Sequence, residues 1–167
     1  SHLRAAGRPG AQAVAGADHG VISDRLAGHK TTAYFPLLLG LREAQRAQCM
    51  EALWLTTANH LAEGCVSNVF LVKDGSLRTP PLTTPVLPGI ARAVVLEIAR
   101  ASAVEVSEVT LGINDLLDAD EVFLTNSIMQ VMPVVRVEKH EVGGGKVGPT
   151  TRRILDEYRN CVRRECG

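Results

Sequence analysis

The sequence predicts an α/β domain with a mixed sheet. Three observations support this fold class. Segments typical of strands alternate with segments typical of helices along the chain. The length of 167 residues suits a single domain. A composition of 46% hydrophobic and 22% charged residues can form a buried core, which argues against a disordered chain.

The chain is expected to begin with residues 1–20 as a linker or disordered lead-in, because they are rich in alanine and glycine and show no clear periodicity. The folded domain would then span residues 21–167, starting with a short strand at 21–23. A helix is predicted over residues 32–48, with Thr31 or Thr32 as its cap, a proline in its first turn and an apolar stripe behind it.

Alternating apolar residues predict strands over 51–57 and 68–73. The dipeptide Asp74-Gly75 then predicts a tight hairpin into residues 76–78. Turn residues and apolar periodicity place the remaining elements. These are a rigid extended link over 79–82, helices over 87–101, 113–117 and 149–162, strands over 104–109, 121–125 and 131–137, and a glycine turn over 143–145.

The charge balance argues against a nucleic-acid partner, because Lys+Arg and Asp+Glu each number 18 and leave no excess of basic residues. A small-molecule partner is expected instead. No apolar run approaches the roughly 20 residues that a membrane span needs, and no secretion signal is recognisable. The four cysteines show no paired metal-ligand spacing, so we expect reduced thiols, no metal site and a cytoplasmic protein.

Lys30 is the first candidate for chemistry. It follows the turn Gly28-His29 and precedes the predicted helix, with Tyr34 four residues further on, a spacing that would place both side chains on one helix side. From its position alone Lys30 would be read as a solvated surface lysine. A desolvated lysine is a better nucleophile and base, and a nearby phenol could steer its protonation.

An acidic residue and two helix or strand ends complete the pattern. Glu63 precedes a turn of small residues that contains Ser67 and Asn68. The segment 87–92 opens a helix, and helix amino termini bind phosphate; Arg92 could assist or could form a structural salt bridge. The strand over 121–125 leads into Asn126 and Ser127, which could form a second anion-binding turn. Each segment alone is equally compatible with an ordinary turn or cap.

The four segments in this order resemble the class IV (fold type IV) pyridoxal-phosphate-dependent aminotransferases. That family includes branched-chain aminotransferases, D-amino-acid aminotransferases and aminodeoxychorismate lyases. The resemblance covers about residues 26–159. It implies a mixed sheet that forms a pseudo-barrel with helices packed around it, and pyridoxal 5'-phosphate as the cofactor.

The resemblance also implies roles for individual residues. Lys30 would form the Schiff base and move a proton, Tyr34 would line the substrate pocket, and Glu63 would pair with the pyridine nitrogen, keeping the ring an electron sink. The implied cofactor-binding residues are Lys30, Glu63, Ser67, Asn68, Leu87, Gly89, Ile90, Ala91, Asn126 and Ser127. Two positions depart from the family pattern, Ala33 where asparagine is frequent and Ala91 where threonine is.

The largest departure concerns the region before Lys30. Members of the family carry a small N-terminal domain that supplies a phosphate-binding arginine and one wall of the substrate pocket, whereas this chain resembles the large C-terminal domain alone. The expected activity is amino-group transfer between a branched-chain-like amino acid and a 2-oxo acid, in a homodimer. Two alternatives stay open: an aminodeoxychorismate lyase that forms 4-aminobenzoate and pyruvate, and a truncated domain without activity. A lysine-dependent aldolase would not explain Glu63 and the two phosphate-type turns.

Overall fold

The computed structural model describes residues 11–15, 21–22 and 28–166, which contain a ten-stranded sheet and four helices. The strands are β1 (Ala11–Ala15), β2 (Val21–Ile22), β3 (Glu51–Thr56), β4 (Leu61–Gly64), β5 (Asn68–Lys73), β6 (Ser76–Thr79), β7 (Val106–Glu108), β8 (Glu121–Asn126), β9 (Gln130–Val137) and β10 (His140–Glu141). The helices are α1 (Phe35–Arg46), α2 (Ile90–Ala101), α3 (Ile113–Leu117) and α4 (Pro149–Cys166). Among the described residues, no helix is long and apolar enough to cross a membrane.

The sheet closes on itself. Its pairings run from β9 to β1, β3, β4, β5 and β8, and β8 pairs with β9 again, which completes a ring of strands. The two pairings of β1 are parallel and the other four are antiparallel, so the sheet is mixed. The predicted α/β class and the pseudo-barrel are therefore confirmed.

Strands β3, β5 and β8 of the ring are buried on both faces, because one face lines the barrel and the other lies under helices. In β5, Val69 and Leu71 belong to the inner cluster, while Phe70 and Val72 belong to the outer cluster beneath α2 and α4. Phe70 stacks on Phe123 of the neighbouring strand, with ring centroids 4.9 Å apart. Successive side chains of a strand point to opposite faces, which explains the unbroken apolar runs of these strands.

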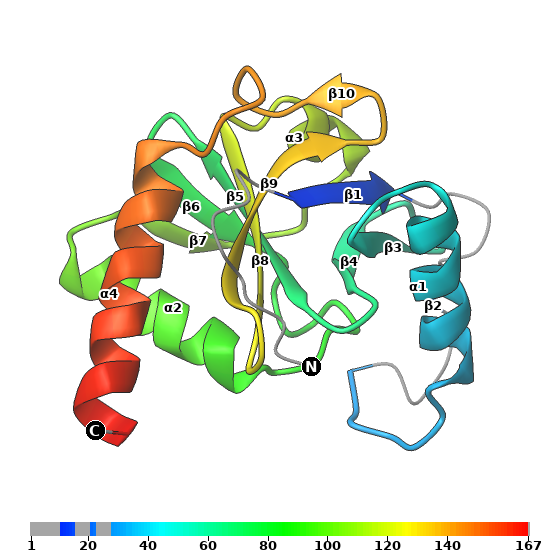
Figure 1. Ribbon diagram of the computed structural model, residues 1–167, viewed down its shortest axis with the longest axis horizontal. Coiled ribbons are helices and arrows are strands. Elements are labelled where there is room, and N and C mark those ends of the chain that lie inside the picture. The colour runs from blue at the N-terminus through cyan, green and yellow to red at the C-terminus, as the bar shows by residue number, and fades with distance from the viewer. Residues whose placement is uncertain (1–10, 16–20, 23–27, 167) are drawn as a thin grey trace.

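The helices surround the barrel and leave one end for the candidate site. In Figure 1, α2 and α4 pack on one side of the strands and α1 packs on the other. The short helix α3 lies at one end, where Leu116 enters the inner cluster. The turn between β8 and β9 lies at the opposite end of the barrel. That end carries the segments from which the sequence predicts chemistry.

Several predicted elements are confirmed and several are wrong. The predicted bounds of β5 and α3 match, and the hairpin at Asp74-Gly75 forms with positive φ at both residues (51° and 77°). The segment predicted as a linker contains β1, and β4 and β10 were not predicted. Helix α1 begins at Phe35, three residues later than predicted, and neither predicted threonine caps it, because its N-cap is Tyr34 without a side-chain hydrogen bond.

Candidate functional site

The turn between β4 and β5 is fastened to the segment that precedes α2. Glu63 and Asn68 face each other across the two strands. Glu63 Oε2 accepts hydrogen bonds from the Leu87 N–H at 2.9 Å and, more weakly, from Asn68 Nδ2 at 3.5 Å. Asn68 Nδ2 also donates to the Leu87 carbonyl at 2.8 Å. Three of the predicted cofactor-binding residues therefore form one hydrogen-bonded group.

Glu63 is a partly buried carboxyl group, and no cationic group of the described residues pairs with it. Burial raises its pKa to about 7, the Leu87 N–H opposes this shift, and the charge of nearby Glu51 adds to it. Within the described part of the chain both hydrogen bonds reach Oε2, and none reaches Oε1. The second oxygen is therefore free to accept a bond from a protonated ring nitrogen, which would also favour the ionised carboxylate. On this observation, the carboxylate of Glu63 fits the protonated ring nitrogen of pyridoxal phosphate.

The start of α2 has the properties of an anion-binding helix end. Gly89 is its N-cap and no side chain of the described residues caps the helix; the first N–H groups, at Ile90 and Ala91, lack an intrahelical partner. A Cβ atom at Gly89 would lie 2.2 Å from Asn68 Oδ1, so Asn68 leaves no room for a side chain there. Asn68 thus contacts both Glu63 and the α2 start.

Arg92 does not join this helix end. Its guanidinium is buried, donates to the Pro80 carbonyl at 2.9 Å and pairs with Glu108 at 2.7 Å. The structural reading of Arg92, which the sequence left open beside a role in binding, is the one that the geometry supports.

Two of the remaining polar residues predicted for the site, Ser67 and Asn126, have local partners. Ser67 is buried and donates to Glu51 at 2.9 Å. Asn126 Nδ2 donates to the Val66 carbonyl at 3.0 Å, and its Oδ1 accepts from the N–H groups of Ile128 and Met129. Asn126 therefore joins the β8–β9 turn to the β4–β5 turn. Ser127 is exposed beside it.

Lys30 and Tyr34 lie in the exposed loop before α1, so the prediction that they share one side of a helix is wrong. Within the described residues Lys30 makes no hydrogen bond or ion pair. Its loop nevertheless lies close to the group around Glu63. A Cβ atom at Gly28 would lie 3.2 Å from the Val86 carbonyl oxygen, and Val86 directly precedes Leu87, which donates to Glu63.

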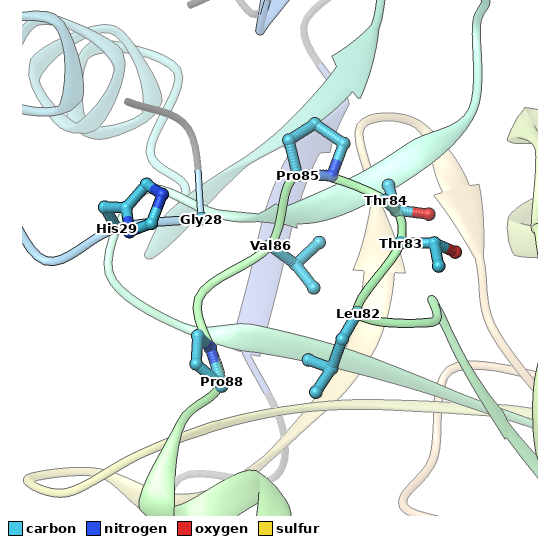
Figure 2. Close-up of a pocket in the computed structure, with 8 residues that line it drawn as sticks. All are labelled: Gly28, His29, Leu82, Thr83, Thr84, Pro85, Val86 and Pro88. Atoms are coloured by element: carbon cyan, nitrogen blue, oxygen red, sulfur yellow. The ribbon is translucent and has the colours of Figure 1, made fainter. Parts of the chain in front are cut away.

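A pocket of about 370 Å³ opens between the loop of Lys30 and the segment before α2. Figure 2 shows its lining, with Gly28 and His29 on one side and the loop that ends at Pro88 on the other. The lining residues are Gly28, His29, Leu82, Thr83, Thr84, Pro85, Val86 and Pro88. None of them is a predicted site residue. However, His29 directly precedes Lys30 in the sequence, and Val86 and Pro88 flank Leu87.

One residue of the site was missed at the sequence level. Glu51, the first residue of β3, has no exposed surface and accepts hydrogen bonds from the β4–β5 turn. Its only signal in the sequence is a charged residue at the start of an apolar strand, because the turn that it contacts lies 14 to 16 residues away.

Comparison with known proteins shows the family. The model for amino-transferase class IV matches residues 19–137, so the chain belongs to the class IV aminotransferases. The branched-chain-amino-acid aminotransferase of Escherichia coli (strain K12) is 40% identical over 125 residues, which cover 75% of this chain and 40% of that protein. A probable branched-chain-amino-acid aminotransferase of Aquifex aeolicus is 36% identical over 132 residues, covering 78% and 42%.

Solved structures agree with this assignment. The crystal structure of the Escherichia coli branched-chain amino acid aminotransferase matches with a TM-score of 0.86 and 33% identity, over 91% of this chain and 52% of that one. The branched-chain amino acid aminotransferase of T.th., solved with pyridoxamine 5'-phosphate, matches with a TM-score of 0.87 and 30% identity, over 94% and 53%. This chain therefore spans about half the length of these relatives. Their names favour a transaminase over the lyase alternative.

Proposed function

We propose that this chain is the cofactor-binding part of a pyridoxal-phosphate-dependent aminotransferase that acts on branched-chain amino acids and 2-oxo acids. The observation that carries the proposal is Glu63, a partly buried carboxyl group with one oxygen held by the segment that leads into α2 and the other unbonded among the described residues. The names of the relatives support the substrate class, and the solved relative with pyridoxamine 5'-phosphate supports the cofactor.

Different residues of this chain would bind the ring and the phosphate of the cofactor. When bound, the cofactor supplies an electron-withdrawing ring that stabilises negative charge at the substrate carbon. Glu63 Oε1 would hold a proton at the ring nitrogen. The Lys30 amine would take the proton from the substrate Cα and deliver it to C4′ of the cofactor. Tyr34, in the same loop, would contact the substrate.

The phosphate end would rest on two backbone segments. The N–H groups of Ile90 and Ala91 lie at the start of α2, which no side chain of the described residues caps and where the helix dipole favours an anion. Asn126 and Ser127 would contribute from the β8–β9 turn, which Asn126 holds against the β4–β5 turn. Asn68 would fix the spacing between the two ends, since it contacts both Glu63 and the Leu87 carbonyl.

A labelling experiment tests the proposal. The purified protein is incubated with pyridoxal phosphate and reduced with borohydride, and the modified peptide is mapped by mass spectrometry. We expect a stoichiometric adduct on Lys30 that is lost in Lys30→Ala and kept in Lys73→Ala, because Lys73 is held by Asp118 and Asp120, which follow α3 at the other end of the barrel (Figure 1). Labelling spread over several lysines would contradict the proposed site and would support the truncated, inactive alternative.

The substrate class is tested separately, with the loaded protein. We expect leucine, isoleucine and valine to convert the bound cofactor to its amine form, seen as a loss of its visible absorption, faster than aspartate does. A second half like that of the longer relatives would supply the rest of the substrate pocket. If conversion occurs only when such a segment is present, the activity belongs to the two parts together.

Homodimer formation and a cytoplasmic location are further parts of the proposal. Helix α1 presents apolar side chains to solvent, with Phe35 71% and Leu38 56% exposed, and an apolar patch of this kind is typical of an interface. We expect light scattering to give twice the mass of the chain and Leu38→Glu to shift it toward one chain. A monomer at all concentrations would exclude the dimer, and cell fractionation would test the location.

A further inference from the structure

Glu51 is a buried carboxylate whose hydrogen bonds converge on the candidate site. It is 0% exposed. Its Oε1 accepts from the N–H groups of Ala52 and Cys65, each at 3.1 Å, and its Oε2 accepts from the Ser67 hydroxyl at 2.9 Å and, at 3.4 Å, from the Val66 N–H. Three of these four donors belong to the turn between β4 and β5.

The chain packs closely against Glu51 and Ser67 at Gly64, the residue before this turn. A Cβ atom at Gly64 would lie 2.3 Å from the Ser67 hydroxyl oxygen and 3.0 Å from the carboxyl carbon of Glu51. The two oxygens of a carboxylate can accept hydrogen bonds from all of these N–H and O–H groups at once. A glutamine amide at this place would instead point its own NH₂ group at some of these donors. The turn is therefore built around an acceptor-only side chain.

The turn connects the ring-binding and the phosphate-binding parts of the proposed cofactor site. Only Gly64 separates Glu63 from the turn, and Asn68 directly follows it. The Val66 carbonyl in its middle accepts the hydrogen bond of Asn126, which comes from the phosphate-side turn. A displacement of the turn would therefore move the ring-binding and the phosphate-binding residues together.

We propose that Glu51 is a positioning residue for the cofactor: it holds the β4–β5 turn so that Glu63 and Asn68 keep the geometry that the cofactor requires. The inference rests on the proposed function, because it assigns Glu51 a role in that same site. Glu51 would not contact the cofactor itself, since it is fully buried behind the turn.

Electrostatics give this role a signature that a purely structural residue would lack. Burial is the main cause of the raised pKa of Glu63, and the negative charge of Glu51 adds to it. Removing that charge should therefore lower the pKa of Glu63, whereas loss of a distant structural hydrogen bond should leave it unchanged. The shift is measurable in the cofactor-free protein and so does not depend on activity.

Glu121 provides the matched control. It is a second buried carboxylate that accepts two backbone N–H groups, those of Thr150 at 3.0 Å and Thr151 at 2.7 Å, at the start of α4. The variants to compare are Glu51→Gln and Glu121→Gln, with pyridoxal phosphate binding measured by titration. We expect the dissociation constant to rise about tenfold or more in Glu51→Gln and to stay unchanged in Glu121→Gln, although both variants lose stability.

The second readout is the titration of the Glu63 carboxyl carbon by NMR, assigned with Glu63→Gln. Its midpoint should move to lower pH in Glu51→Gln and stay in place in Glu121→Gln. If Glu51→Gln does not fold, Ser67→Ala removes one donor and keeps the carboxylate, and it should weaken binding about threefold or more. Equal effects of the Glu51 and Glu121 variants on binding and midpoint, or full affinity in Ser67→Ala, would overturn the inference.

The design separates this inference from the proposed function. If the unaltered protein binds no pyridoxal phosphate, the proposed function fails, and an unchanged Glu63 midpoint in Glu51→Gln would overturn the inference as well. If the unaltered protein binds the cofactor at Lys30 and Glu51→Gln binds equally well, only the role of Glu51 fails.

Discussion

At the scale of single residues, two carboxyl groups that are shielded from water, those of Glu63 and Glu51, define the candidate site. The sequence pointed to Glu63 because it stands before a turn of small residues, and the structure brings it together with Asn68 and Leu87. The sequence could not reveal its raised pKa, which depends on burial by segments far along the chain. Glu51 escaped notice for the same reason.

The raised pKa of Glu63 predicts a pH dependence of stability in the cofactor-free protein. The pKa is about 7 in the folded chain and near the ordinary 4.5 when unfolded. Between these values the folded state keeps a proton that the unfolded state has lost, so stability falls as the pH rises, by at most about 3 kcal/mol. We expect urea unfolding at about pH 5 and about pH 8 to show this loss in the unaltered protein relative to Glu63→Gln. Parallel pH profiles would contradict the prediction.

Two buried threonines give a second prediction at this scale. The hydroxyl of Thr151 is buried without a hydrogen-bond partner in the described part of the chain, whereas the Thr79 hydroxyl donates to the Val69 carbonyl at 2.8 Å. Replacing a buried, unbonded hydroxyl by a methyl group of similar shape removes a desolvation cost. We expect Thr151→Val to gain about 1 kcal/mol and Thr79→Val to lose about 1–2 kcal/mol in unfolding free energy. Equal effects would show that hydrogen bonding does not distinguish them.

At the scale of elements, those with a local sequence signal were predicted well, and those that depend on contacts with other elements were not. The Asp74-Gly75 turn and the apolar run behind it fixed β5 and its hairpin, since both depend on neighbouring residues. The four-residue strand β4 has no such signal, and it exists because it pairs with β3 and β5. The late start of α1 was missed for a different reason. Thr31 and Thr32 are residue types that favour a helix N-cap, but the helix begins after them, with Tyr34 as its N-cap.

The contact between the β4–β5 turn and the α2 start leads to a third prediction. Gly89 and Gly112 are both N-cap glycines in extended conformation. A Cβ atom would lie 2.2 Å from Asn68 Oδ1 at the first and no closer than 3.7 Å to any atom at the second. We expect Gly89→Ala to cost about 1–3 kcal/mol of unfolding free energy and Gly112→Ala much less. In the Asn68→Ala background the cost of Gly89→Ala should shrink; an undiminished cost would place its cause elsewhere.

At the scale of the whole molecule, the closed ring of strands determines where the site lies. The resemblance to a known family predicted a pseudo-barrel, but the alternation of helices and strands alone predicted only a mixed sheet. The strand that completes the ring, β1, lies in a segment whose alanine and glycine content suggested a linker. Its assignment depends on pairing with β3 and β9, which are about 40 and 120 residues away in the sequence, and no local pattern reports such pairing.

The closure of the ring gives the last prediction. Because β1 has a strand on each side, it is a central strand, and a proline within it would remove a backbone donor and clash with its neighbours. We expect Val14→Pro to cost about 3 kcal/mol or more of unfolding free energy, and Val14→Ala, which keeps the backbone N–H, to cost clearly less. Cofactor binding should weaken in Val14→Pro even where the chain stays folded, since β3, which carries Glu51, would lose one of its neighbouring strands. If the proline and alanine variants behaved alike, β1 would not be holding the barrel closed, and the site would have to be positioned by β3, β4, β5 and β8 alone.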